Sequence, residues 1–307
     1  MAVNIGQKIG EAEYTTLRSG INLVMGTPTG TGTGAAGYNQ AITAPAISPG
    51  DKITAAAWNA LKADIEKAYT HQTGVAYSPA LPTAAVGSNI TKDIHDRVET
   101  AVDFIKSASN RFLLGSGQST VVSASSRTKT NWNGTQVHDV TFTWADANSV
   151  KAFFNAGGYL RFVTTLTGGS GAKYLDWKSM VDGVGTVEMN YVNVSKSGAS
   201  GTVINDGYYD LNTTARYLVS KAGSTPYAEN DYQIEARSIT NGVRIRLIYR
   251  DDDVGDQRAV VGAGPAGPAV DENVNGTLTS SISYIRPTGS NVSVAAPTVA
   301  LGTSNTF

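Results

Sequence analysis

The sequence holds three histidines, and histidine is the side chain that most readily exchanges a proton or binds a metal near neutral pH. His71 and His95 fall in two separate segments with helical spacing, and His138 falls in a strand-like run, so the three show no metal-site spacing. The motifs His-Glu-x-x-His and Gly-x-Ser-x-Gly are absent from the sequence. The sequence therefore favours a protein that is not an enzyme.

Acidic side chains gather at one place in the sequence. Asp251, Asp252, Asp253 and Asp256 fall within six residues, directly after a strand-like run. Such a group could hold Ca²⁺, but it lacks the ligand spacing and the closing Glu of an EF-hand loop. We expect a solvated turn here, and whether these four carboxylates hold a cation stays open.

A glycine-rich segment lies between two predicted helices. Gly32, Gly34 and Gly37 have the spacing of a dinucleotide-binding fingerprint. That fingerprint needs a strand before it and a helix after it, whereas a helix precedes this segment and an irregular stretch follows. We expect an extended loop and no bound cofactor.

The composition excludes several classes of protein. Hydrophobic residues make up 41% of the chain and charged residues only 16%, which is typical of short strands joined by many turns. A net charge of −1 gives no positive field for nucleic acid, and the absence of cysteine excludes disulfides and thiolate metal sites. No run approaches eighteen apolar residues and the first residues lack a signal-peptide pattern, so we expect no membrane insertion.

A repeat marks the first hundred residues. The segment 6–17 reappears at 50–61 with Gly, Lys, Ile, Ala and Leu in the same places, and a fainter copy begins at Gly87. Thr54 and Thr91 are good N-caps for the helices that follow. The predicted helices cover residues 10–24, 54–71 and 91–108.

Each predicted helix carries an apolar stripe at three- and four-residue spacing. We interpret the stripes as an assembly interface that docks on a larger assembly or on sister subunits, since three short helices with long links bury little area alone. The alternative is the ordinary core of three amphipathic helices. The interface residues would be Tyr14, Leu17, Ile21, Trp58, Leu61, Ile65, Val98, Val102 and Ile105.

From about residue 117 the periodicity changes to that of strands. Asn241-Gly242 is the best hairpin turn, and the segments 147–154 and 174–181 show helical spacing instead. The prediction is an α+β fold, with a small N-terminal helical region followed by a mainly antiparallel β-sandwich with short helical insertions. The predicted strands are 136–144, 159–166, 186–192, 215–219, 232–236, 243–249 and 278–285.

The predicted regions are a helical anchoring part at 1–115, a β-rich domain at 116–287 and an extended tail at 288–307. Two triplets of collagen type, at 262–269, predict an exposed loop. The tail is rich in Thr, Ser, Val and Ala and almost free of charge. Two interpretations of it remain open: a frayed terminus, or a strand added to a neighbouring subunit.

The chain also resembles a known family over most of its length. The likeness rests on Gly6-Gln7-Lys8-Ile9 leading to Glu13-Tyr14, on Gly37-Tyr38-Asn39-Gln40, and most specifically on Phe153-Phe154-Asn155-Ala156-Gly157-Gly158 followed by Leu160-Arg161-Phe162. Trp177-Lys178-Ser179-Met180 and Gly207-Tyr208-Tyr209-Asp210-Leu211 complete it. In these stretches the sequence resembles virion structural proteins of contractile-tailed marine cyanophages and related phages.

The resemblance implies a component of a neck, tail or fibre, assembled in the host cytoplasm, and brings no catalytic residues with it. The expected partners are other copies of the chain, with a trimer favoured over larger rings, and neighbouring virion proteins. The alternative is a receptor-binding module in which the β-rich domain contacts host surface carbohydrate.

Overall fold

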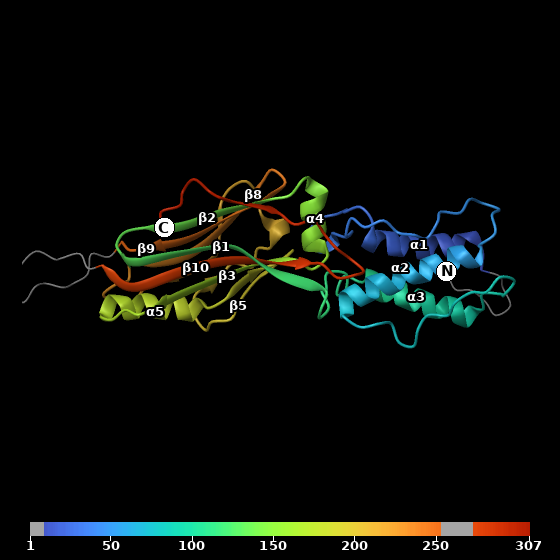
Figure 1. Ribbon diagram of the computed structural model, residues 1–307, viewed down its shortest axis with the longest axis horizontal. Coiled ribbons are helices and arrows are strands. Elements are labelled where there is room, and N and C mark those ends of the chain that lie inside the picture. Colours follow the sequence, from blue (N-terminus) through green and yellow to red (C-terminus); the bar gives the residue numbers. More distant parts are fainter. Residues whose placement is uncertain (1–8, 253–272) are drawn as a thin grey trace, which may run out of the picture. The chain divides into compact units, whose positions relative to one another are not determined.

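The structure is a computed structural model that describes residues 9–252 and 273–307. Its internal contacts divide the chain into two compact units (Figure 1). The helical unit comprises Met1–Thr120, Asp146–Gly158 and Arg286–Ala296, and the β unit comprises Val121–Ala145, Tyr159–Ile285 and Pro297–Phe307. The first passage between the units lies close to the predicted boundary after residue 115. The later passages differ from the prediction, because 146–158 and 286–296 return to the helical unit.

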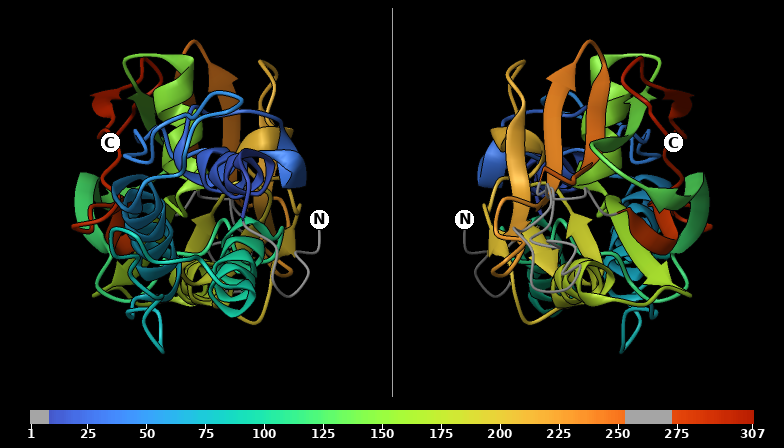
Figure 2. Two further views of the ribbon diagram at one scale, coloured as in Figure 1. Left: turned by 90° about the vertical axis from the view of Figure 1, so that its right-hand side faces the viewer. Right: turned by 90° about the vertical axis from the view of Figure 1, so that its left-hand side faces the viewer.

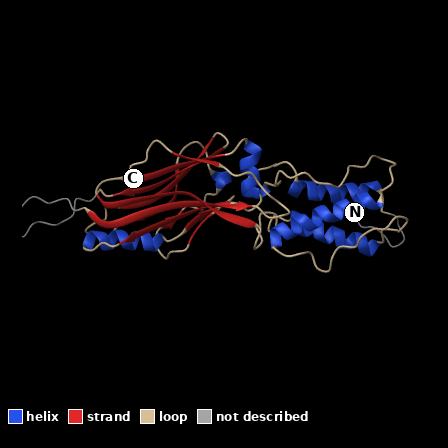
Figure 3. Cartoon of the chain, viewed as in Figure 1, coloured by secondary structure: helices blue, strands red, loops and turns tan. Residues whose placement is uncertain are grey.

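The helical unit is built around α1 (Glu11–Met25), α2 (Ala55–Thr73) and α3 (Lys92–Lys106), which pack pairwise against one another (Figure 3). All three were predicted, and the predicted caps are confirmed. Thr54 Oγ1 accepts a hydrogen bond from the Ala57 N–H at 3.1 Å, and Thr91 Oγ1 accepts one from the Ile94 N–H at 3.4 Å. At the start of α1 the cap is Gly10, whose N–H donates to Glu13 Oε2 at 3.0 Å.

A fourth helix, α4 (Ala147–Asn155), belongs to the helical unit. The sequence predicted this helix, but as an insertion in the β-rich domain at 116–287. Its last residue explains the difference, because the Asn155 amide donates to the Ala36 and Gly37 carbonyls at 2.9 and 3.1 Å. His71 Nε2 also lies 2.9 Å from the Ala156 carbonyl. Buried polar groups need hydrogen-bond partners, and those of Asn155 and Ala156 are in the helical unit. These hydrogen bonds therefore hold α4 in that unit.

The glycine-rich segment is a loop, as predicted. Gly32–Gly34 forms a single 3₁₀ turn, and Thr29 and Ala36 on either side of it pair as an antiparallel bridge. The loop follows α1, so the strand that a dinucleotide fingerprint requires before its glycines is replaced by a helix.

The β unit is a sandwich of two antiparallel sheets, seen end-on in Figure 2. One sheet has the order β1-β10-β3-β4-β5 and the other the order β11-β2-β9-β8-β7-β6. The strands are β1 (Ser119–Trp132), β2 (Gln136–Thr143), β3 (Tyr159–Thr167), β4 (Val187–Met189), β5 (Val194–Lys196), β6 (Thr202–Val203), β7 (Arg216–Ala222), β8 (Asp231–Ile239), β9 (Gly242–Arg250), β10 (Val274–Pro287) and β11 (Thr298–Leu301).

Side chains between the sheets form both apolar and polar contacts. Thr164 Oγ1 on β3 lies 2.8 Å from the Tyr232 hydroxyl and 2.7 Å from the Tyr249 hydroxyl on the opposite sheet. The Phe142 and Tyr284 rings meet edge to face across the same interior. Because the hydroxyls of Tyr232 and Tyr249 are hydrogen-bonded to Thr164, these two tyrosines can be buried without loss of hydrogen bonds.

Helix α5 (Ala172–Val184) packs against β3 and β7, as Figure 1 shows for β3. Its Trp177 ring meets those of Trp132 and Tyr249. The α+β architecture with short helical insertions is therefore confirmed. The core residues expected from the sequence are buried except Tyr191, which is half-buried: Trp144, Phe153, Phe162, Trp177, Leu218, Ile234 and Ile245.

The predicted Asn241-Gly242 hairpin joins β8 to β9. Asn241 has a φ of 54°, a left-handed conformation that asparagine tolerates better than most residues. At Gly242, an added Cβ would lie 2.0 Å from the Phe142 carbonyl oxygen on β2. Glycine is therefore required there by the close approach of the neighbouring strand.

Candidate functional site

The nine residues predicted as an assembly interface all lie in the interior of the helical unit. Each is at most 2% exposed in the single chain. The structure thus brings them together as the core of α1, α2 and α3, so they offer no surface to a second subunit. The apolar stripes were predicted correctly, but each packs against the neighbouring helices of the same chain and not against another subunit.

The histidines are separated, as the sequence indicated. Burial lowers the pKa of His71 to about 4, although its bond to the Ala156 carbonyl opposes the shift. Burial and the nearby Arg127 lower the pKa of His138 to about 4, against the opposing effect of Asp139. Both imidazoles are fully buried and hydrogen-bonded, and His138 contacts Ser125 and Ser280. They are therefore part of the packed interior of their units.

The predicted acidic turn is only partly solvated. Asp251 is buried, and its Oδ2 lies 2.9 Å from Nζ of Lys173, itself 2% exposed. Trp177 Nε1 donates to Asp251 Oδ1 at 3.4 Å. The expectation of a solvated turn is wrong for Asp251, since this carboxylate neutralises a buried lysine. Asp253, Asp256 and the collagen-type triplets at 262–269 lie outside the described residues.

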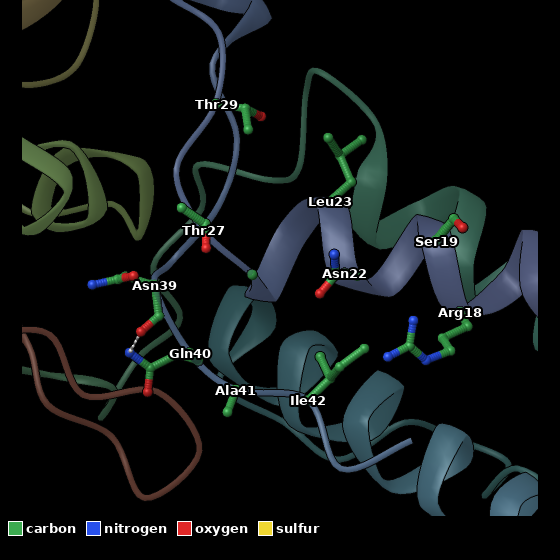
Figure 4. Close-up of a pocket in the computed structure, with 11 residues that line it drawn as sticks. Arg18, Ser19, Asn22, Leu23, Thr27, Thr29, Asn39, Gln40, Ala41 and Ile42 are labelled. Atoms are coloured by element: carbon green, nitrogen blue, oxygen red, sulfur yellow. Dashed lines mark hydrogen bonds between the residues drawn. The ribbon is translucent and has the colours of Figure 1, made fainter. Parts of the chain in front are cut away.

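A polar pocket of about 600 Å³ lies in the helical unit beside α1 (Figure 4). Arg18, Asn22 and Leu23 line it from α1, and Asn39 and Gln40 line it from the following loop. The Arg18 Nε donates to the Ala44 carbonyl at 2.9 Å, and the Gln40 amide donates to backbone carbonyls. The lining offers a guanidinium, amides and hydroxyls, which can donate and accept hydrogen bonds to a bound polar molecule.

The C-terminal tail lies on its own chain. Its strand β11 pairs with β2, with Leu301 opposite Val140. Beyond it, Asn305 and the Asp139 backbone bond each other in both directions, at 2.8 and 2.9 Å. Burial acts to raise the pKa of Asp139, but hydrogen bonds from Arg244 and from the Ser304 N–H hold it below its usual value. The interpretation of the tail as a frayed terminus is therefore wrong, and in the single chain the strand that it adds lies on β2 of its own chain.

At the margin of the other sheet, β1 remains the outermost strand. It is hydrogen-bonded to β10 on one side, and the order of described strands places nothing on its other side. With 14 residues it would extend for about 45 Å. A strand in this position presents a row of backbone N–H and C=O groups to which another strand can bond.

The cover over β1 is also incomplete. Val121, Ser123 and Ser125 share one face of the strand, because side chains alternate. Ser125 Oγ contacts His138 Nε2 of the opposite sheet at 2.8 Å, so this face points inward. Val121 is nevertheless 59% exposed and Ser123 is exposed too. The opposite sheet therefore stops short of this end of β1.

Charge divides β1 into two parts. Arg127 and Lys129 lie in its second half, and cations on an edge strand discourage strand addition. The segment Val121–Ser126 carries no charge and no proline. We call this segment the neutral β1 edge. Strand β1 was not among the strands predicted from the sequence, although its Thr and Val residues were a usable signal.

Comparison with protein-family models, with curated proteins and with solved structures gives no match. Among the described residues, no helix has both the length and the apolar character needed to cross a bilayer.

Proposed function

We propose that this protein is a structural component of a tailed-phage virion, in its neck, tail or fibre, and that it acts by self-association and docking rather than by catalysis. The neutral β1 edge is the observation that carries the proposal. This segment has an unpaired strand edge, and its Val121 is exposed on the face that points inward. A strand from a second subunit would pair with the edge and bury the valine.

The surroundings of this edge support the same role. Among the described strands, the other edge strands β5, β6 and β11 have only 3, 2 and 4 residues, whereas β1 has 14, so β1 offers the longest unpaired margin. The described cavities show binding groups without a nucleophile and base in contact. The resemblance to virion structural proteins points in the same direction, and a trimer remains the favoured assembly.

Replacing Val121 with lysine is expected to weaken self-association at least about tenfold, because strand addition would then bury a charge. The stability of one chain should hardly change, since Val121 is 59% exposed. The matched control is Val86→Lys, at a loop residue that is 96% exposed. The measurement is the mass distribution of the full chain in solution, against 32.1 kDa for one copy.

Equal association of the two variants and the unmodified chain would remove the neutral β1 edge from the proposal. A chain that stays monomeric at concentrations of about 100 μM would remove self-association itself. Docking is tested on particles of a phage that encodes the protein, by imaging them with a labelled antibody against it. Label at a defined place on the particle is the expected result, and unlabelled particles would contradict the virion role.

The polar pocket beside α1 favours one alternative, contact with host surface carbohydrate. Amide and hydroxyl groups such as those of Asn22, Asn39 and Thr27 are suited to sugar hydroxyls. This differs from the sequence-based alternative, which assigned carbohydrate contact to the β-rich part. A glycan array probed with the full chain and with an Asn22→Leu variant separates the two functions, because only carbohydrate recognition predicts a signal that the variant loses.

A further inference from the structure

Three side chains of α3 bring possible metal ligands together. His95, Asp96 and Glu99 offer one imidazole nitrogen and two carboxylate oxygens that all lie within 4.8 Å of one another. His95 Nδ1 is 3.6 Å from Asp96 Oδ1 and 3.9 Å from Glu99 Oε2. His95 and Glu99 are four residues apart, which places them one above the other on the same helix face. It is the one such group within the described residues.

The imidazole in this group is buried. His95 is 2% exposed, and its Nδ1 makes no hydrogen bond among the described residues. A buried polar atom without a partner is costly, and most such atoms in folded proteins are satisfied. A bound cation would give the nitrogen lone pair a partner at this position, with the proton of the neutral ring on Nε2.

The surrounding residues leave the carboxylates available. Lys92 Nζ pairs with Asp96 Oδ2, so Oδ1 is the oxygen turned to His95. A small cavity lies at the same place between α1 and α3, lined by Glu13, Thr16, Leu17, His95 and Glu99. One oxygen of Glu13 accepts the Gly10 N–H. The cavity is thus also lined by a carboxylate from a second helix, that of Glu13 on α1.

We propose that His95, Asp96 and Glu99 bind a divalent transition-metal ion of the zinc class. One imidazole and two carboxylates suit Zn²⁺ or Co²⁺ better than Ca²⁺, which prefers oxygen ligands alone. Water or Glu13 would fill the remaining positions. Because the cavity lies between α1 and α3, the ion would stabilise the contact between these helices. This inference is independent of the virion role and of the neutral β1 edge.

The test uses the full chain, freed of metal with a chelator, and Zn²⁺ alone as the probe. Calorimetry is expected to show about one Zn²⁺ per chain, and Zn²⁺ should raise the unfolding temperature by mass action. Glu99→Gln removes one ligand at a residue that is 38% exposed in its side chain, and should weaken binding at least about tenfold. The matched control is Asp103→Asn on the same helix, since Asp103 is exposed and pairs with Lys106 instead.

His95→Gln tests the buried ligand and should weaken Zn²⁺ binding as well. If that variant fails to fold, as judged by circular dichroism, Glu99→Gln decides the question by itself. Binding that is weakened in Glu99→Gln and unchanged in Asp103→Asn supports the site. Binding that is equal in Glu99→Gln and the unmodified chain, or no saturable binding up to about 1 mM Zn²⁺, would overturn it.

Discussion

Replacing Asp251 with alanine is expected to lower the free energy of unfolding of the β unit by about 3–5 kcal/mol. The substitution leaves the Lys173 ammonium buried at 2% exposure, without the carboxylate that lies 2.9 Å from it. A buried charge that loses its counter-charge is far more costly than the loss of the same pair at a surface. Lys173→Met is expected to destabilise the unit for the same reason, because it removes the ammonium that lies 2.9 Å from the buried Asp251 carboxylate.

Two controls separate burial from the mere loss of an ion pair. Lys178 and Asp182 form a second pair on α5, at 2.7 Å, but their side chains are 40% and 58% exposed. Asp182→Ala should therefore cost less than about 1 kcal/mol. The double variant Lys173→Met with Asp251→Leu should regain most of the stability, because both charges of the buried pair are removed together.

Denaturant unfolding can follow the two units separately. Trp58 belongs to the helical unit, and the other three tryptophans belong to the β unit. In a Trp58→Phe background, tryptophan fluorescence reports the β unit alone. A loss of less than about 1 kcal/mol for Asp251→Ala would show that the lysine has found solvent or another partner.

Acidification from pH 7 to pH 5 is expected to destabilise both units, by about 2 kcal/mol for each buried histidine. Burial lowers the pKa of His71 and of His138 to about 4, whereas an unfolded histidine titrates near 6.5. Between pH 6.5 and pH 4 these histidines are protonated in the unfolded chain but remain neutral in the folded chain. Stability is therefore present above pH 6.5 and falls as the pH is lowered toward 4.

The effect can be assigned to single residues. His71 lies in the helical unit and His138 in the β unit, so His71→Gln should flatten the pH dependence of the first and His138→Gln that of the second. Arg127 and Asp139 are the charged groups beside His138, and neither changes charge between pH 7 and pH 5. Denaturant midpoints measured across this range check the prediction. An unchanged slope in both variants would mean that carboxylates cause the destabilisation.

Much of the fold was predictable because local signals and packing agree. The helices α1, α2 and α3 have apolar residues at helical spacing, with good N-caps at α2 and α3, and long strands such as β3 and β10 alternate clearly. Strand β1 was not predicted, because its serines suit a loop and its two valines are adjacent instead of alternating with polar residues. Its role as a strand depends on β10, which lies some 150 residues further along the chain.

The candidate sites were harder to predict than the fold. An apolar stripe shows that a helix packs against something, but not whether that partner is the same chain or another; Trp58 and Leu61 were assigned to the wrong partner for this reason. The Lys173–Asp251 pair joins residues far apart in the sequence. Neither residue carries a local mark of burial, so only the folded chain identifies the pair.

The interleaving of the two units constrains how the protein is made. Because Arg286–Ala296 completes the helical unit, that unit stays unfinished on the ribosome until residue 296 of the 307 has been added. A polypeptide released early, for instance within the sandwich, would therefore lack a finished N-terminal module as well as its missing end.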